Sequence, residues 1–250
     1  TNRPFRAPHH SASVTAVTGG GAQLRPGEMS LAHRGVLFFD ELPEFGRETL
    51  ETLRQPLEDR TITITRAQGT ARYPAHFIFV ATANPCPCGY HGYEGIRSCA
   101  CSEAQVNSYR QRLSGPVLDR IDLHSSVHEV DHAALLAGPS DPEDEEAVAR
   151  KHIREARRRQ AERFGTPAKL NADMTNADLR QLRLEPEALS ILTQAARSLG
   201  LSARGYLRTI KVAQTIADLE ASPVITGAHL ADALNYRPGR DAAYPDNGGV

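Results

Sequence analysis

Two adjacent acids, Asp40 and Glu41, follow the unbroken apolar run of residues 35–39. Such a run is typical of a central strand in a parallel sheet that is covered on both faces. Open α/β sheets bind ligands at the carboxyl ends of their strands, and the two carboxylates are expected there. In that position Asp40 would hold Mg²⁺, through water, and Glu41 would polarise the water that attacks the γ-phosphate of ATP. The alternative is a strand that ends in solvated acids.

A second apolar run, residues 77–81, is followed by Asn84. In an oligomeric ATPase the strand next to the acidic one ends in a polar residue that helps to orient the attacking water. Asn84 fits this first-sensor role. On its own, an Asn before Pro85 is more often a turn former.

Three arginines are candidates for contacts with nucleotide phosphates. Arg120 lies in a Leu-Asp-Arg-Ile-Asp motif, and its planar guanidinium suits the γ-phosphate held by a neighbouring subunit. Arg204 opens an amphipathic segment and is expected to contact nucleotide from a helical lid, with Arg208 as the substitute. The alternatives are a local ion pair of Arg120 with Asp119 or Asp122, and solvated helix charges for the other two.

The four cysteines form two C-x-C pairs, Cys86 with Cys88 and Cys99 with Cys101. Four thiolates can enclose one tetrahedral Zn²⁺, so the pattern predicts a structural metal site. C-x-C is a less usual spacing than C-x-x-C, and His91 is a rival ligand. The alternative is a reduced loop that faces solvent.

Composition places few limits on function. The chain has 250 residues, 40% hydrophobic content and a formal net charge of −1, which is ordinary for a globular protein. A near-neutral balance means that any DNA contact must come from local patches. The basic residues of the segment 150–163 could follow phosphates, but interleaved acids make a solvated helix face the favoured interpretation. No apolar run approaches the ~20 residues that span a bilayer, and a cytoplasmic protein without a membrane contact is expected.

A phosphate-binding loop of the form Gly-x-x-x-x-Gly-Lys-[Ser/Thr] is missing upstream of Asp40. The three lysines, Lys151, Lys169 and Lys211, all come later and none follows a glycine. The chain is therefore expected to be a fragment that does not hydrolyse ATP by itself.

The order of predicted elements indicates an α/β core followed by a helical part. The strand of residues 35–39 is followed by a helix over residues 45–57, a hairpin over 61–73 and the strand of 77–81. Gly200 and Thr226 are expected to end and begin helices. The predicted domains are a partial α/β core over residues 1–137, a linker over 138–146, a helical domain over 147–237 and a disordered tail over 238–250.

Taken in order, the motifs resemble the magnesium-chelatase-like branch of the AAA+ ATPases, and within it the ComM/YifB group. The resemblance extends to about Arg237. The segments that carry it are residues 3–10, 26–33, 35–45, 54–58, 84–89, 114–122 and 213–219.

The resemblance implies an AAA+ core of the P-loop type, incomplete here, and a small helical lid. It further implies that residues 61–73 form a hairpin facing the pore of a ring, where Arg66, Gln68 and Arg72 would contact DNA. By the same resemblance the complete protein is an ATP- and Mg²⁺-dependent hexameric motor for DNA branch migration in natural transformation, acting on single-stranded or branched DNA.

Two other functions stay open. One is a chelatase-type motor subunit for metal insertion, although the loop at residues 84–88 is a feature of the ComM/YifB group. The other is a non-catalytic module for regulation or protein remodelling. The retained Asp40–Glu41 pair argues against the non-catalytic module.

Overall fold

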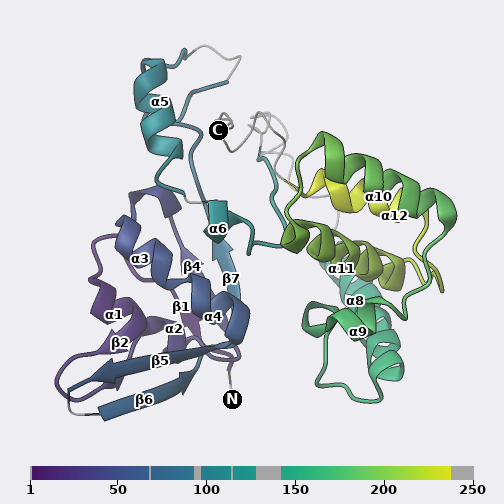
Figure 1. The fold of residues 1–250 in the computed structure, drawn as a ribbon, viewed down its shortest axis with the longest axis horizontal. Coiled ribbons are helices and arrows are strands. Elements are labelled where there is room, and N and C mark those ends of the chain that lie inside the picture. Colours follow the sequence, from purple (N-terminus) through teal and green to yellow (C-terminus); the bar gives the residue numbers. More distant parts are fainter. Residues whose placement is uncertain (1, 68, 93–96, 114, 128–141, 238–250) are drawn as a thin grey trace. The chain divides into compact units, whose positions relative to one another are not determined.

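The computed structural model describes residues 2–67, 69–92, 97–113, 115–127 and 142–237, with side chains from residue 145 onward in the last range. These residues form two compact units, one ending at Ile121 and the other beginning at Asp122 (Figure 1). The first unit is α/β and the second is helical, so the predicted fold class is confirmed. Of the predicted linker, residues 138–141 lie outside the described residues and residues 142–146 belong to a helix; the predicted tail lies wholly outside the described residues.

A parallel sheet forms the centre of the first unit. Its three strands are β1 (Phe5–Arg6), β4 (Val36–Phe39) and β7 (Ile78–Ala81), in the order β1-β4-β7. β4 and β7 pair from Val36 opposite Ile78 to Phe39 opposite Ala81. The two strands therefore end level with each other at their carboxyl ends.

One face of this sheet carries the core. Leu37 and Phe39 are fully buried, and Phe39 stacks on Phe45 with ring centroids 4.1 Å apart. On the other face Ile78 is 59% and Val80 42% exposed. The expectation of a sheet covered on both faces is therefore not met within the described residues, where the helices pack on the Phe39 face.

The first unit also contains short helices and turns. They are α1 (Val14–Thr18), α2 (Glu28–Leu31), the 3₁₀ turn η1 (Leu42–Glu44), α3 (Arg47–Thr52), α4 (Arg54–Asp59), α5 (Glu103–Arg110) and α6 (Gly115–Leu118). The single helix predicted over residues 45–57 is thus divided between α3 and α4. Pro56 has no N–H to donate to the carbonyl of Thr52, where α3 ends, and this accounts for the break.

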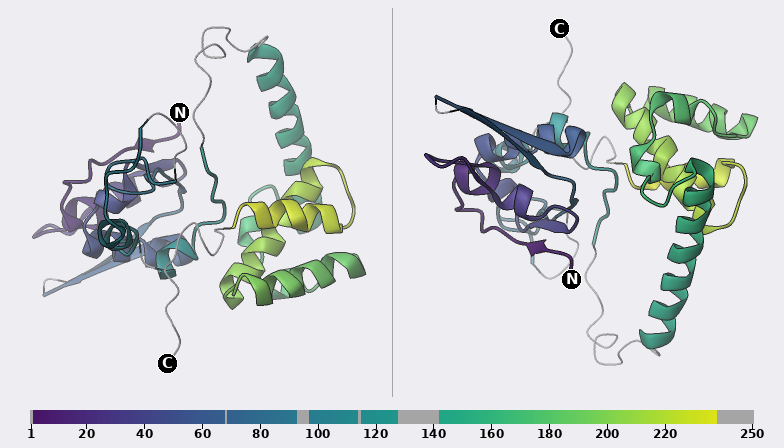
Figure 2. Two further views of the ribbon diagram at one scale, coloured as in Figure 1. Left: turned by 90° about the horizontal axis from the view of Figure 1, so that it is seen from above. Right: turned by 90° about the horizontal axis from the view of Figure 1, so that it is seen from below.

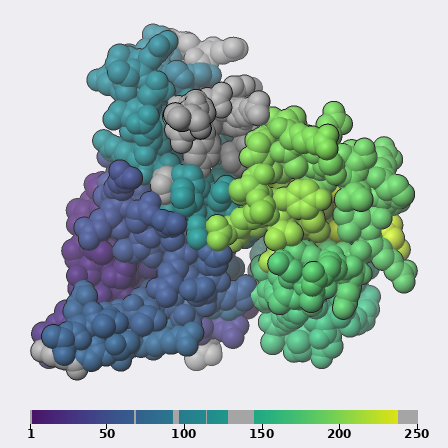
Figure 3. All heavy atoms as spheres, in the orientation of Figure 1, coloured from purple at the N-terminus to yellow at the C-terminus, as the bar shows by residue number. Residues whose placement is uncertain are grey.

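Two hairpins complete the first unit. The short one joins β2 (Gly19–Gly20) to β3 (Arg25–Pro26), and the long one joins β5 (Thr61–Arg66) to β6 (Gly69–Pro74). Ile62 and Ile64 alternate with exposed residues along β5 and are buried, as the strand period requires. The long hairpin predicted for residues 61–73 is present, and Figure 3 shows it as a ridge along one edge of this unit.

The second unit is a group of helices. It comprises α8 (Pro142–Phe164), η2 (Asn171–Asp173), α9 (Asn176–Leu179), α10 (Pro186–Ser198), α11 (Ala203–Leu219) and α12 (Gly227–Asn235). Its core includes Leu192, Ile210 and Leu230. Gly200, at φ +63°, follows α10, and the Thr226 hydroxyl caps α12, as predicted. Figure 2 shows the first turns of α8 projecting beyond the other helices of the unit. No helix among the described residues is long and apolar enough to cross a membrane.

Candidate functional site

Asp40 and Glu41 lie at the carboxyl edge of the sheet, as predicted. Both side chains are exposed, directly after β4. Thr82, the residue after β7, lies beside them because Phe39 and Ala81 are paired. The Thr82 hydroxyl donates a hydrogen bond to Asp40 Oδ1 at 2.6 Å and accepts one from the Glu41 backbone N–H at 2.9 Å. One hydroxyl therefore holds the Asp40 carboxylate and the Glu41 backbone.

The backbone turns sharply at Glu41. This residue is in the left-handed region, with φ 53° and ψ 56°, which costs a non-glycine residue about 1–2 kcal/mol. The turn is held by the backbone N–H of Leu42, which donates to the Thr82 carbonyl at 2.8 Å. Strained backbone of this kind gathers at functional sites, where neighbouring contacts enforce it. It leaves an open, anionic edge suited to a hydrated divalent cation.

Sequence reasoning missed Thr82. Asn84, the predicted polar end of the second strand, is exposed two residues further along the same loop. A threonine at the end of an apolar strand carries little signal of its own. Its proximity to Asp40 depends on the pairing of β4 with β7, which is a long-range contact. The role of Asn84 stays a prediction.

Arg120 is almost fully buried in the first unit. Its Nε donates to Glu58 Oε2 at 3.0 Å, and its Nη1 donates to the Pro116 carbonyl at 2.6 Å. The local partner is thus Glu58, at the end of α4, and not the adjacent acids. In this single chain the guanidinium joins α4 to α6, and its contact with a neighbour's nucleotide stays a prediction.

The two arginines of the helical unit differ in their surroundings. Arg204, in the first turn of α11, is exposed. Arg208 forms an ion pair with Asp122 inside the same unit. Contact of either arginine with a nucleotide stays a prediction.

The long hairpin presents a basic outer surface. Arg66 and Arg72 are exposed, and each also contacts its own hairpin: Arg66 donates to the Thr65 carbonyl and Arg72 to the Thr61 hydroxyl. Gln68, the third predicted contact, lies outside the described residues. The short hairpin β2–β3 contacts the long hairpin, where the Tyr73 hydroxyl donates a hydrogen bond to the Leu24 carbonyl.

Several basic residues of α8 have partners inside the helical unit. Arg158 pairs with Glu155 and Glu162 along the helix, and Arg163 reaches the buried carboxylate of Asp218. These contacts favour the interpretation of α8 as a solvated and internally paired helix. The ion pairs do not favour α8 as a surface that binds the phosphates of DNA.

The four cysteine sulfurs come together. Cys86 Sγ lies 3.4 Å from Cys88 Sγ and 3.7 Å from Cys99 Sγ, and all four sulfurs lie within 4.8 Å of one another. Hydrogen bonds from the backbones of Tyr90 and Ala100 lower the pKa of Cys88 to about 6. Among the described residues this metal-binding group consists of the cysteines, and His91, the rival ligand, is not in it.

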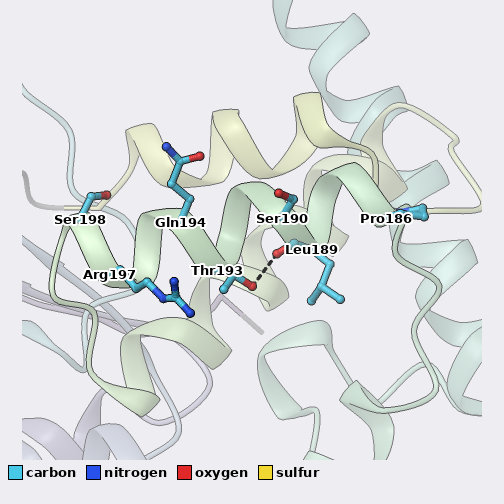
Figure 4. A pocket seen from close by; sticks show the side chains of 7 residues that line it. All are labelled: Pro186, Leu189, Ser190, Thr193, Gln194, Arg197 and Ser198. Atoms are coloured by element: carbon cyan, nitrogen blue, oxygen red, sulfur yellow. Dashed lines mark hydrogen bonds between the residues drawn. The ribbon is translucent and has the colours of Figure 1, made fainter.

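A hollow of about 750 Å³ lies along α10 (Figure 4). Leu189, Thr193 and Arg197 are among its lining residues. The Thr193 hydroxyl donates a hydrogen bond to the Leu189 carbonyl at 2.8 Å. All of the lining residues belong to one helix. The hollow has no group of acids or bases suited to catalysis, so the acidic edge of the sheet is the stronger candidate site.

Comparisons with known proteins identify the family of this chain. The family model described as magnesium chelatase, subunit ChlI, matches residues 1–135, and the model for the C-terminal part of that subunit matches residues 143–237. The chain is 45% identical over 236 residues both to the uncharacterised protein YifB of Escherichia coli and to the competence protein ComM of Haemophilus influenzae. It is 42% identical over 244 residues to an uncharacterised protein of Mycobacterium tuberculosis. These alignments cover 94% or 95% of the chain, which spans 45% or 46% of each relative's length.

Proposed function

This chain belongs to the magnesium chelatase ChlI family, and we propose that in the complete protein it forms part of an ATP-hydrolysing AAA+ motor subunit that acts on DNA. The observation that carries the proposal is the acidic edge of the sheet. There Asp40 and Glu41 are exposed side by side, and the Thr82 hydroxyl contacts both.

The residues at this edge suit Mg²⁺ and the phosphates of ATP. Asp40 would hold the hydrated cation, which supplies charge neutralisation, and Glu41 would orient and polarise the attacking water. Asn84 would assist from the loop after β7. Catalysis by positioning and electrostatics needs carboxylates fixed in place, and the Thr82 hydroxyl supplies that support to the Asp40 carboxylate.

Ring assembly is part of the same proposal. Hydrolysis would take place between subunits of a hexamer, with Arg120 reaching a neighbour's nucleotide and Arg204 acting from the lid. Because Arg120 holds Glu58 in the single chain, assembly would have to exchange that carboxylate for a phosphate. Arginine suits both partners, since its planar fork matches carboxylate and phosphate alike.

DNA is proposed as the substrate of the motor. The exposed Arg66 and Arg72 on the hairpin β5–β6 supply local positive charge in a chain that is close to neutral overall. One relative is named as a competence protein, and this name supports the proposal of DNA as the substrate. The name of the family model favours a second candidate, a motor for metal insertion.

The deciding measurement is steady-state ATPase activity of the complete protein with and without single-stranded and four-way-junction DNA. We expect DNA to stimulate turnover, and Glu41→Gln to abolish turnover while ATP binding is kept. ATPase activity that is indifferent to DNA would overturn the DNA proposal and favour metal insertion. Turnover unchanged by Glu41→Gln would overturn the assignment of the acidic edge.

A double variant separates the hairpin from the acidic edge. Arg66→Ala with Arg72→Ala is expected to reduce the stimulation by DNA and leave basal ATPase activity unchanged, because neither arginine lies at the edge of the sheet. The matched control is Arg180→Ala, an exposed arginine of the helical unit. Equal stimulation in the double variant and the control would remove the hairpin from the DNA surface.

A further inference from the structure

We propose that Cys86, Cys88, Cys99 and Cys101 bind one Zn²⁺, and that this ion fastens α5 to the edge of the sheet that carries Asp40 and Glu41. The sulfur positions carry the first half of the proposal. Cys86 Sγ–Cys88 Sγ, Cys88 Sγ–Cys99 Sγ and Cys86 Sγ–Cys99 Sγ measure 3.4, 3.6 and 3.7 Å. A tetrahedron of sulfurs with Zn–S bonds of about 2.3 Å has edges of about 3.8 Å.

The same distances argue against disulfides. A disulfide needs an S–S bond of about 2.05 Å, and all four cysteines are free. Nearly equal distances among three sulfurs also fit one shared metal ion better than two separate pairs of cysteines. Four thiolates in a tetrahedron are typical of zinc or of an iron–sulfur centre, and we assign zinc.

The place of the cluster in the chain carries the second half. Cys86 lies two residues after Asn84, and Cys101 immediately precedes Ser102, whose side chain caps α5. An ion held by these sulfurs would therefore join the end of β7 to the start of α5. Cys86 is fully buried, so one of the four sulfur ligands is already enclosed by the first unit.

Two arginines near the end of α5 contact the loops next to the acidic edge. Arg110 Nε donates to the Pro85 carbonyl at 3.4 Å, next to Asn84. Arg112, just beyond the helix, donates to Glu44 Oε2 at 3.1 Å and to the Pro43 carbonyl at 3.3 Å, both in the turn after Glu41. α5 thus contacts the loops that follow β4 and β7, and a metal at its start would fix its position against both.

The first test uses the chain as purified, without reducing or chelating agents. Elemental analysis is expected to give close to one zinc per chain. Alkylation followed by mass spectrometry is expected to leave all four cysteines unmodified until a strong chelator is added. A folded chain with no zinc and four reactive thiols would overturn the proposal, as would iron in place of zinc.

Variants then test the ligand set. Cys99→Ser is expected to lose the zinc, and the matched control His91→Ala, in the same loop, is expected to keep it. Loss of zinc in the His91 variant with retention in the Cys99 variant would contradict the four-cysteine site. If Cys99→Ser does not fold, the alkylation result on the unaltered chain still decides.

A third measurement addresses the fastening of α5. Hydrogen exchange of the zinc-loaded chain is compared with that of the chelator-treated chain. We expect removal of the metal to speed exchange in α5 and in the loop after β7, and to leave α10 and α12 unchanged. Equal exchange in α5 with and without metal would overturn the positional half of the proposal. None of these tests depends on ATPase activity or on DNA.

Discussion

Thr82 is the residue on which the geometry of the acidic edge depends. Its hydroxyl contacts the Asp40 carboxylate and the Glu41 N–H, and its carbonyl accepts from Leu42. The strained backbone of Glu41 is held by these contacts. Substitutions that keep the shape of Thr82 and remove its hydroxyl therefore test whether positioning of the acids matters.

We predict that Thr82→Val lowers Mg²⁺-dependent ATPase activity of the complete protein by roughly 10–100-fold, the usual cost of losing a group that orients a metal ligand. Thr82→Ser should keep most of the activity, because it restores the hydroxyl. Thr63→Val, on the exposed face of β5, serves as the control for the change in polarity. A valine variant with normal turnover would show that the acids keep their positions without Thr82.

At the scale of elements, the two hairpins depend on each other. Glycine is required at the start of β2, opposite Pro26 of β3: Gly19 has φ +97°, and a Cβ there would lie 2.6 Å from the Arg25 carbonyl and from the Gly27 nitrogen. It would also meet Ile64 of the long hairpin at 3.0 Å. Gly19 is thus a place where the two hairpins pack closely.

We expect Gly19→Ala to lower the free energy of unfolding of the first unit by more than about 2 kcal/mol, since both backbone strain and overpacking oppose it. Gly21→Ala is the matched control: its φ is +71°, but a Cβ there meets nothing within 4 Å, so a loss of about 1 kcal/mol is expected. Denaturant unfolding of the two variants measures the difference. Equal losses would contradict close packing of the hairpins at Gly19.

At the scale of the whole molecule, each unit has a core of its own. The helical unit also has a buried polar centre at Asp218, which is fully buried. Its carboxylate accepts hydrogen bonds from Arg163 at 2.9 Å, Asn171 at 2.8 Å and Gln214 at 3.1 Å. These contacts join α8 and η2 to α11.

Asp218→Ala should destabilise the helical unit by about 3–5 kcal/mol, because it leaves the partly buried Arg163 without its counter-ion. Glu162→Ala removes an exposed pair on the same helix and should cost less than about 1 kcal/mol. Since the cores are separate, hydrogen exchange should quicken in the helical unit alone. Parallel loss of protection in β4 and β7 would show that the two units unfold together.

Local patterns in the sequence predicted most of the elements and part of the site. The apolar run before Asp40 and Glu41 predicted a strand and the place of both acids at its carboxyl end. The alternation in residues 61–65 fixed the long hairpin, and Gly200 and Thr226 marked helix ends. These features depend on backbone preferences and on burial within a few residues, so they can be read along the chain.

Contacts between distant segments were decided only by the tertiary structure. Thr82 meets Asp40 because β4 and β7 pair in register, and Arg120 meets Glu58 because α6 packs near α4. The spacing of the cysteines allowed a metal site, but the convergence of their sulfurs depends on the fold of the loop between them. Side-chain partners far apart in the chain are selected by packing and by the need to satisfy buried polar groups, and a single sequence does not record those choices.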